Sequence, residues 1–270
     1  MSSRPVIALL GFAFVAMARA DDDAWGARLE LISEQAVIAP GRPFEIGIHI
    51  HHRDGFHSYW KNPGLVGFAT QVDWKLPDGF TAGSLTWPPP ELVDMAGHTC
   101  HGYHRDVLLT ATITPPAELS AETVTLEARI AWMACSDACH PGDEVFPITL
   151  PVGPEPKADP DTAALFSKAR GERPGPLTGW KVELLSGIDD PRIVLRLTRT
   201  DAGGPLLKDP YFFSSDGQVD DGRPSVASRE AGVEIWTFER AGFGPTDAKG
   251  LPGIIAYGPE GARRHGTIAP

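Results

Sequence analysis

The feature that most limits the fold is a series of short strand-like apolar runs, most of them ended by a proline or glycine turn. The segments with this strand character are residues 44–50, 72–76, 107–113, 124–130 and 145–150. The 29 glycines and 26 prolines of the chain interrupt helices and end strands early. About seven or eight short strands before residue 153 predict an immunoglobulin-like β-sandwich, although the Cys…Trp…Cys spacing of true immunoglobulin domains is absent.

The remainder of the chain predicts a second, smaller β-sandwich after a linker. Residues 154–175 form this linker, with one short helix over residues 162–170 that is capped by Asp159 or Asp161. Strand-like runs then cover residues 180–185, 193–197, 211–213, 233–238 and 253–257. The sequence therefore predicts an all-β chain with two immunoglobulin-like sandwiches, over residues 21–153 and 176–270. The second sandwich has no cysteine and one histidine, which favours a structural or docking module.

Residues 1–20 have the pattern of a secretory signal peptide. Arg4 precedes an apolar run over residues 6–16, and Ala18-Arg19-Ala20 has the small-x-small pattern of a cleavage site. No later run reaches the about eighteen apolar residues that a transmembrane helix needs. We expect a periplasmic protein that is cleaved after Ala20, is not inserted in the membrane and keeps its disulfides.

The charge of the chain limits the classes of partner. It carries 35 acidic and 24 basic residues, a formal net charge of −11. Such a charge disfavours binding to nucleic acid or to anionic membranes. The sequence contains no GxGxxG, P-loop, HExxH or GxSxG motif, so nucleotide and serine-nucleophile chemistry have no support.

The residues with the clearest chemistry are Cys135 and Cys139. An apolar run leads into Cys135, three residues turn the chain, and a Pro-Gly pair follows Cys139 and His140. Thiols at this spacing reach disulfide distance through one tight turn. A disulfide that closes a loop of roughly five residues stabilises a fold by about 2 kcal/mol. A disulfide that closes a longer loop, such as Cys100 to Cys135, would contribute about 4 kcal/mol. We therefore interpret the pair as a reversible redox couple, with a structural staple as the alternative.

The neighbours of the pair have opposite electrostatic effects. Asp137 disfavours a thiolate beside it, whereas protonated His140 favours one. Asp137 is equally well interpreted as a turn residue whose side chain bonds to the backbone. We expect Cys139, next to His140 and the turn, to be the cysteine that is attacked first. Cys100 is the third cysteine and has no partner in this pair. It has three interpretations: a buried small hydrophobic residue, a third redox thiol, or a metal ligand.

Copper(I) binding is the alternative chemistry. The soft ligands in this part of the chain are Met95, His98, Cys100, His101, His104, Met133, Cys135, Cys139 and His140. A copper-binding or copper-tolerance protein would use Cys135 and Cys139 together with His98 and Cys100. No pair has the spacing of a closed zinc site, and His49 and His51 are interpreted as exposed strand residues. The favoured hypothesis therefore includes no cofactor.

Four ordered motifs resemble a known family. They are HSYWKNPG at residues 57–64, VDWKLP at 72–77, GYHRDVLL at 102–109 and CSDACHPG at 135–142. Together they resemble the periplasmic N-terminal region of the thiol:disulfide interchange protein DsbD, in its ScsB-like branch associated with suppression of copper sensitivity. The resemblance is strong over residues 44–152 and looser to about residue 268. It departs from the family pattern in having three residues, rather than five, between the cysteines.

The resemblance implies both a function and a site. Such domains take electrons from a membrane-embedded domain and pass them to periplasmic thioredoxin-fold partners, here through Cys135 and Cys139. Residues 95–102 would form a cap over the pair, placing His98, Cys100 and His101 beside the thiols, with Tyr59, Trp60 and Tyr103 in support. The sequence lacks the membrane-spanning and thioredoxin domains of the full reductase. We therefore expect a protein-disulfide-reductase-type electron carrier whose membrane donor acts in trans.

Overall fold

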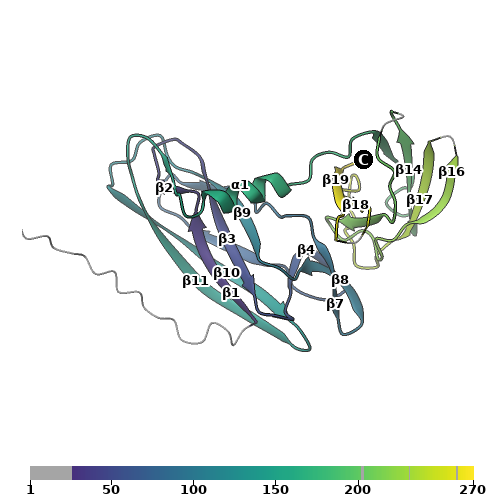
Figure 1. Cartoon of the computed structure of the whole chain (residues 1–270), viewed down its shortest axis with the longest axis horizontal. Coiled ribbons are helices and arrows are strands. Elements are labelled where there is room, and N and C mark those ends of the chain that lie inside the picture. Colours follow the sequence, from purple (N-terminus) through teal and green to yellow (C-terminus); the bar gives the residue numbers. More distant parts are fainter. Residues whose placement is uncertain (1–25, 202–203, 231, 260) are drawn as a thin grey trace, which may run out of the picture.

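The computed structural model describes residues 26–270 except 202–203, 231 and 260. The signal-peptide prediction for residues 1–20 therefore lies outside the described residues. The described chain contains nineteen strands and one helix, arranged as two β-rich lobes (Figure 1). The all-β prediction is confirmed. Within the described ranges, no helix has the length and hydropathy that a bilayer-spanning segment needs.

The first lobe is a sandwich of two antiparallel sheets. One sheet has the order β1 (Ala27–Ser33), β3 (Phe44–His52), β9 (Val107–Thr114) and β6 (Thr81–Ala82); the other has β11 (Cys139–Pro151), β10 (Thr123–Cys135) and β5 (Gln71–Lys75). Ile48 and Leu109 of the first sheet and Ile130 of the second belong to one buried core. The period-two alternation predicts these strands because it gives each sheet one apolar face.

A third sheet lies at one end of this sandwich and has the order β4 (Ser58–Gly64), β8 (His98–Tyr103) and β7 (Glu91–Met95). The segment that the resemblance describes as a cap, residues 95–102, belongs to a regular hairpin formed by β7 and β8. Ala96 and Gly97 turn the chain with φ of 52° and 84°. Val93 of β7 and Cys100 of β8 are direct strand partners, and both are buried.

The second lobe is a smaller sandwich. One sheet has the order β13 (Trp180–Leu184), β14 (Arg192–Arg199), β17 (Val233–Glu239) and β16 (Ser225–Glu230). The other has the order β15 (Tyr211–Ser214), β18 (Gly253–Tyr257) and β19 (Arg264–Ile268). Leu195 and Trp236 of one sheet pack with Phe212 and Ile255 of the other. The predicted strands of this half are present with small shifts of their ends.

The segment between the lobes is held against the first lobe. Strand β12 (Lys157–Ala158) pairs with β2 (Gln35–Val37), and helix α1 (Ala163–Glu172) follows. The helix begins after Thr162, whose hydroxyl donates to Ser33 O at 2.6 Å and caps nothing. The predicted cap by Asp159 or Asp161 is therefore wrong: Asp159 Oδ1 accepts instead from the backbone N–H of Asp161.

Helix α1 is anchored by one apolar and several ionic contacts. Phe166 is buried with Leu108 of β9, and Arg170 pairs with Glu34 at 2.6 Å and Glu45 at 2.8 Å. Since these contacts all reach the first lobe, the helix fixes where the chain departs for the second lobe.

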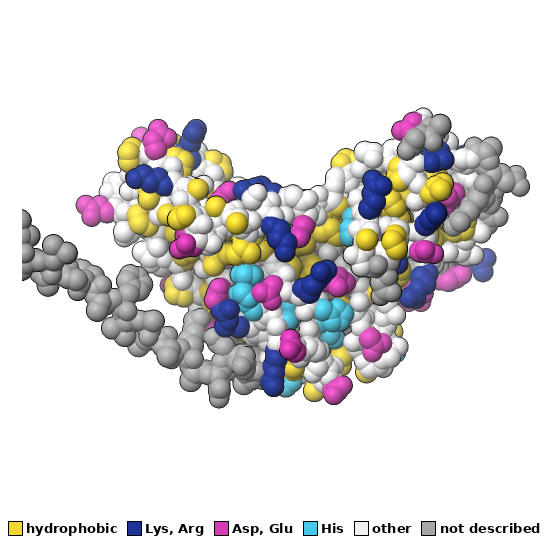
Figure 2. Space-filling view, in the orientation of Figure 1, with side chains coloured by type: hydrophobic (Ala, Val, Ile, Leu, Met, Phe, Trp, Pro, Cys, Tyr) yellow, Lys and Arg dark blue, Asp and Glu magenta, His cyan; other side chains and the backbone are white. Residues whose placement is uncertain are grey.

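The two lobes also touch directly, and the surface is hollowed between them (Figure 2). Tyr211 and Phe213 of β15 belong to the same buried core as Trp60 of β4. The rings of Trp60 and Phe213 have centroids 6.1 Å apart, and Asn62 Nδ2 donates to Ser214 O at 2.7 Å. The third sheet therefore packs against the second lobe on one side and the first sandwich on the other.

Candidate functional site

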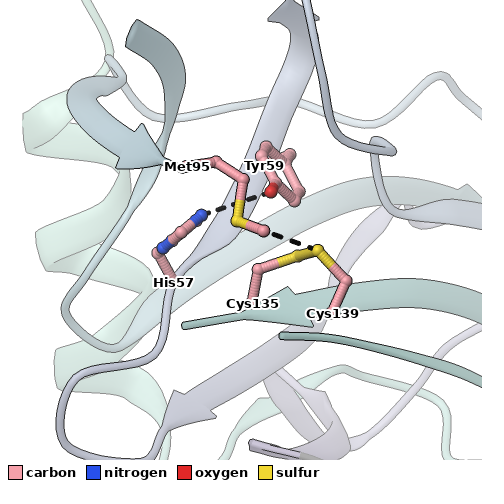
Figure 3. The surroundings of a disulfide bond; sticks show 5 residues. All are labelled: His57, Tyr59, Met95, Cys135 and Cys139. Atoms are coloured by element: carbon pink, nitrogen blue, oxygen red, sulfur yellow. Dashed lines mark hydrogen bonds between the residues drawn. A yellow bond between two sulfur atoms is a disulfide. The ribbon is translucent and has the colours of Figure 1, made fainter. Parts of the chain in front are cut away.

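Cys135 and Cys139 form a disulfide at the tip of the β10–β11 hairpin (Figure 3). They are the last directly opposed residues of the strand pair, with Cα atoms 4.1 Å and sulfurs 2.06 Å apart. Between them, Ser136 N donates to Ala138 O at 3.0 Å and closes the turn. The antiparallel register thus brings two neighbouring cysteines into bonding distance at the end of a long hairpin.

The two cysteines have different exposure. Cys135 is fully buried, whereas Cys139 is exposed. The backbone of Cys135 is also held: it exchanges two hydrogen bonds of 2.9 Å with the backbone of His57, just before β4. The Cys135 sulfur therefore lies at the buried, hydrogen-bonded end of β10, and the Cys139 sulfur lies at the exposed start of β11.

A small apolar cluster surrounds the buried half of the bond. Tyr59, Val93, Cys100 and Cys135 are its buried members, and Val66, Met95 and Met133 pack against it. Met95 Sδ, at the end of β7, lies 3.9 Å from Cys139 Sγ (Figure 3). The β7–β8 hairpin thus lies against the disulfide in this structure.

Cys100 is free and fully buried in this cluster. Its thiol points to the backbone, with Sγ 3.5 Å from His98 O. Burial raises the pKa of the Cys100 thiol, and it raises the pKa of Tyr59 to about 12. Both groups are therefore uncharged near neutral pH, and they give the disulfide an apolar, protonated inner neighbourhood.

The other residues that the resemblance placed beside the thiols are divided between two faces of β8. His98 is exposed next to the hairpin turn. His101 is buried at the lobe contact, with Nδ1 3.0 Å from Asn62 O and Nε2 3.0 Å from Tyr211 Oη. Successive side chains of a strand point to opposite faces, so Cys100 and His101 cannot both face the disulfide. His101 lies away from it.

Four further predicted residues occupy distinct positions. Trp60 is buried towards Phe213 of the second lobe, and Tyr103 donates its hydroxyl to Pro88 O at 2.8 Å. Asp137 is exposed in the turn between the cysteines. His140 is half-buried, with its ring 5.6 Å from that of Phe56. Of this group, only Asp137 and His140 flank the disulfide along the chain.

His57 is a site residue that the sequence prediction missed. It is 2% exposed, its Nε2 lies 3.2 Å from Tyr59 Oη, and its backbone holds Cys135. Burial, and then the nearby His104, lower the pKa of His57, so the imidazole is neutral. The available signal was its place as the first residue of the HSYWKNPG motif.

The potential metal ligands lie elsewhere. Among the described residues, one group of three His, Cys, Asp or Glu side chains has donor atoms close enough to hold an ion: Glu30, His49 and His51. It includes none of the four residues of the copper hypothesis. The prediction that His49 is an exposed strand residue is wrong, because its exposed fraction is 8%.

Comparisons with known proteins agree with the fold. Residues 29–151 match the family model described as "Thiol:disulfide interchange protein DsbD, N-terminal". The crystal structure of the N-terminal periplasmic domain of ScsB from Proteus mirabilis superposes with a TM-score of 0.65 at 16% identity, covering 93% of this chain and 96% of that chain. At this identity the superposition shows a shared fold, and it confirms the immunoglobulin-like architecture.

Other solved structures superpose poorly on this chain. The major pilin subunit BcpA of Bacillus cereus, in the structure of its D312A form, gives a TM-score of only 0.29 at 11% identity, over 90% of this chain and 66% of that chain. No curated protein sequence matches the chain.

Proposed function

Because residues 29–151 belong to the family of N-terminal domains of the thiol:disulfide interchange protein DsbD, we propose that this chain is a periplasmic thiol–disulfide exchange protein. It passes electrons through Cys135 and Cys139 to or from thioredoxin-fold partners. The observation that carries the proposal is a disulfide at a hairpin tip that joins an exposed cysteine to a fully buried one. Family and disulfide together support thiol–disulfide exchange in general; the partner class is our inference.

The unequal exposure of the two cysteines supports a different role for each sulfur. A partner thiolate attacks Cys139 Sγ, a mixed disulfide forms, and the Cys135–Cys139 bond breaks with its electron pair on Cys135 Sγ, which takes up a proton. The partner's second thiolate then attacks its own sulfur in the mixed disulfide and releases Cys139 as a thiolate. The partner is oxidised by two electrons, and this chain becomes the dithiol. Delivery of the electrons to an oxidised partner is the same sequence in reverse.

The surroundings of Cys135 suit it to the resolving role. Its backbone is held by His57, so the sulfur stays in place when the bond to Cys139 opens. The cluster of Tyr59, Val93 and Cys100 encloses Cys135, so a partner reaches it less easily than it reaches the exposed Cys139. A mixed disulfide at Cys139 is therefore resolved by a thiol that is already within bonding distance.

Trapping tests the proposal. In the Cys135→Ala variant, the exposed Cys139 should retain a thioredoxin-fold partner as a mixed disulfide in periplasmic extracts. In the Cys139→Ala variant, the buried Cys135 should trap far less. Cys100→Ala is the matched control and should leave the wild-type pattern unchanged. If neither single variant captures a thioredoxin-fold protein, the carrier function is wrong.

Two further parts of the proposal concern location and donor. The N-terminal pattern of residues 1–20 supports export to the periplasm with cleavage after Ala20. Reduction then depends on a membrane protein that acts in trans. Alkylation of the thiols in cells that lack candidate membrane reductases measures this dependence: loss of the donor should leave Cys135 and Cys139 oxidised.

Copper(I) binding by the reduced site is the second candidate. The observation that favours it is the gathering of sulfur around the bond: Cys100, Met95 and Met133 all pack in the cluster that contains Cys135. Anaerobic titration of the reduced protein with copper(I) tests it. Binding that is lost in Cys100→Ser and weakened in His98→Gln would favour a copper-tolerance function, whereas binding that is indifferent to both substitutions would exclude this ligand set.

A further inference from the structure

A second group of ligand-type side chains lies on the β1–β3–β9 sheet, away from the cysteines in sequence. His49 and His51 alternate on β3 and therefore share one face, with ring centroids 3.8 Å apart. Glu30 of β1 is the direct antiparallel partner of His49. Asp106 immediately precedes β9, the neighbour of β3 on its other side. Three adjacent strands thus bring two imidazoles and two carboxylates together.

Three donor atoms of this group lie close enough together to bind one ion, and they are not hydrogen-bonded to one another. One donor atom each from Glu30, His49 and His51 lies within 4.8 Å of the others. His51 Nε2 faces Glu30 Oε2 at 3.7 Å, is buried, and has no hydrogen-bond partner among the described residues. A buried, unbonded imidazole nitrogen costs free energy unless something fills its lone pair.

The other side of the His51 ring is already oriented. Its Nδ1 is 2.7 Å from Asp106 Oδ2, so the carboxylate accepts the Nδ1–H and leaves Nε2 as the bare acceptor. A carboxylate bonded to the far nitrogen of a histidine is the usual second layer of a metal site, where it fixes the tautomer and increases the basicity of the ligand. The same Asp106 oxygen is 3.9 Å from His49 Nε2.

We propose that Glu30, His49 and His51 bind a divalent transition-metal ion of the zinc and copper(II) class, with Asp106 orienting His51. Two imidazoles and a carboxylate match the ligand preferences of these ions, whereas Mg²⁺ and Ca²⁺ prefer oxygen alone. The site contains no sulfur and is separate from the copper(I) ligand set of the cysteines. It is also independent of the thiol exchange proposed above.

Arg28 limits the affinity of this site. It is the strand partner of His51, and its guanidinium pairs with Glu30 Oε1, which leaves Oε2 facing the histidines. A fixed positive charge beside a cation site weakens binding by repulsion. Replacing Arg28 by glutamine should therefore tighten metal binding, a gain that misfolding cannot imitate.

Titration of the oxidised, full exported chain with zinc chloride by calorimetry tests the site, because the intact Cys135–Cys139 bond removes two competing thiolates. We expect saturable binding of one Zn²⁺, tighter binding of Cu²⁺ and none of Mg²⁺. His51→Gln and Glu30→Gln should abolish it, and Asp106→Asn should weaken it roughly 10- to 100-fold. His104→Gln, which removes an exposed histidine 3.9 Å from Glu91, is the matched control and should bind as wild type does.

A second measurement is independent of affinity. The electron paramagnetic resonance spectrum of bound Cu²⁺ should show coupling to two imidazole nitrogens in wild type, and this two-nitrogen signal should be missing from His51→Gln. Wild-type affinity in His51→Gln and Glu30→Gln, or no saturable binding by wild type, would overturn the proposal. Zinc binding that instead requires Cys100 would assign the metal to the cysteine cluster and would overturn it too.

Discussion

Cys135 and Cys139 lie in different surroundings although one bond joins them. Cys135 is enclosed by Tyr59, Val93 and Cys100, whereas Cys139 is exposed and touches Met95. Reactivity of a thiol follows both its exposure and its thiolate fraction. The chemical difference between the two sulfurs is therefore a property of their positions in the sheet, not of their neighbours in sequence.

Alkylation of the reduced protein should report this difference. Cys139 should react first with iodoacetamide and Cys135 more slowly. Cys100 should react only after unfolding, because the side chain is fully buried and burial raises the pKa of its thiol. Mass spectrometry of timed samples measures the order, with a denatured sample as control. Native labelling of Cys100 at the rate of Cys139 would contradict the buried position.

At the scale of elements, the β7–β8 hairpin and the β10–β11 tip form the site together. The first presents Met95 and the second carries the disulfide, and they meet at the 3.9 Å sulfur–sulfur contact (Figure 3). Met95 is flexible and polarizable, which suits it to a contact that opens and closes. Ala96 and Gly97 at the hairpin turn are exposed.

Shortening Met95 should expose the disulfide further. We expect Met95→Ala to raise the rate of reduction by a small dithiol several-fold with little change in stability, because Met95 is only partly buried. Val145→Ala, at an exposed position of β11, is the control and should leave the rate unchanged. Stopped-flow reduction followed by tryptophan fluorescence measures it. A rate equal to that of wild type would show that Met95 does not restrict access.

Gly142 supports the hairpin that carries the cysteines. It is opposite Trp132 in the β10–β11 register, and a Cβ there would lie 2.2 Å from the indole ring. Gly142→Ala should therefore lower the free energy of unfolding by about 1–3 kcal/mol. Gly171→Ala, in open space within helix α1, is the control and should stabilise the fold by about 0.5–1 kcal/mol. Urea unfolding compares them, and a neutral Gly142→Ala would contradict the packing.

At the scale of the whole molecule, the two lobes share a buried polar contact. His101 of the third sheet lies between Asn62 and Tyr211, and its ring also packs 4.9 Å from that of Phe213. Burial lowers the pKa of His101 to about 4, against about 6.5 in the unfolded chain. The nearby Asp221 raises this pKa but does not offset the burial.

This histidine makes lobe packing sensitive to acid. The unfolded chain binds a proton on His101 more tightly than the folded chain does. The contribution of neutral His101 to the free energy of unfolding is therefore fully present above about pH 6.5 and is lost as the pH falls towards 4. The loss is about 3 kcal/mol at most. His101→Gln should flatten this part of the pH–stability curve, whereas the exposed His98→Gln should not. Urea unfolding between pH 4 and 7 checks this, and identical slopes in wild type and His101→Gln would contradict it.

Much of this architecture was predictable from local pattern. Period-two alternation predicted many strands of both sandwiches, and the spacing of Cys135 and Cys139 predicted that they can form a disulfide, because both depend on residues close together in the chain. The motif over residues 57–64 also pointed to the family whose model matches residues 29–151, although it did not single out His57.

Contacts between distant strands could be decided only by the tertiary structure. The faces of β8 separate Cys100 from His101, and the lobe contact gives His101 and Trp60 partners more than a hundred positions away. Register alone places Glu30 opposite His49. A one-residue shift in pairing would reverse every face. The sequence alone thus determined which side chains are reactive or can bind a ligand, and which segments form many of the strands. Strand pairing decided which of these side chains meet, because side-chain contacts depend on register and packing rather than on local pattern.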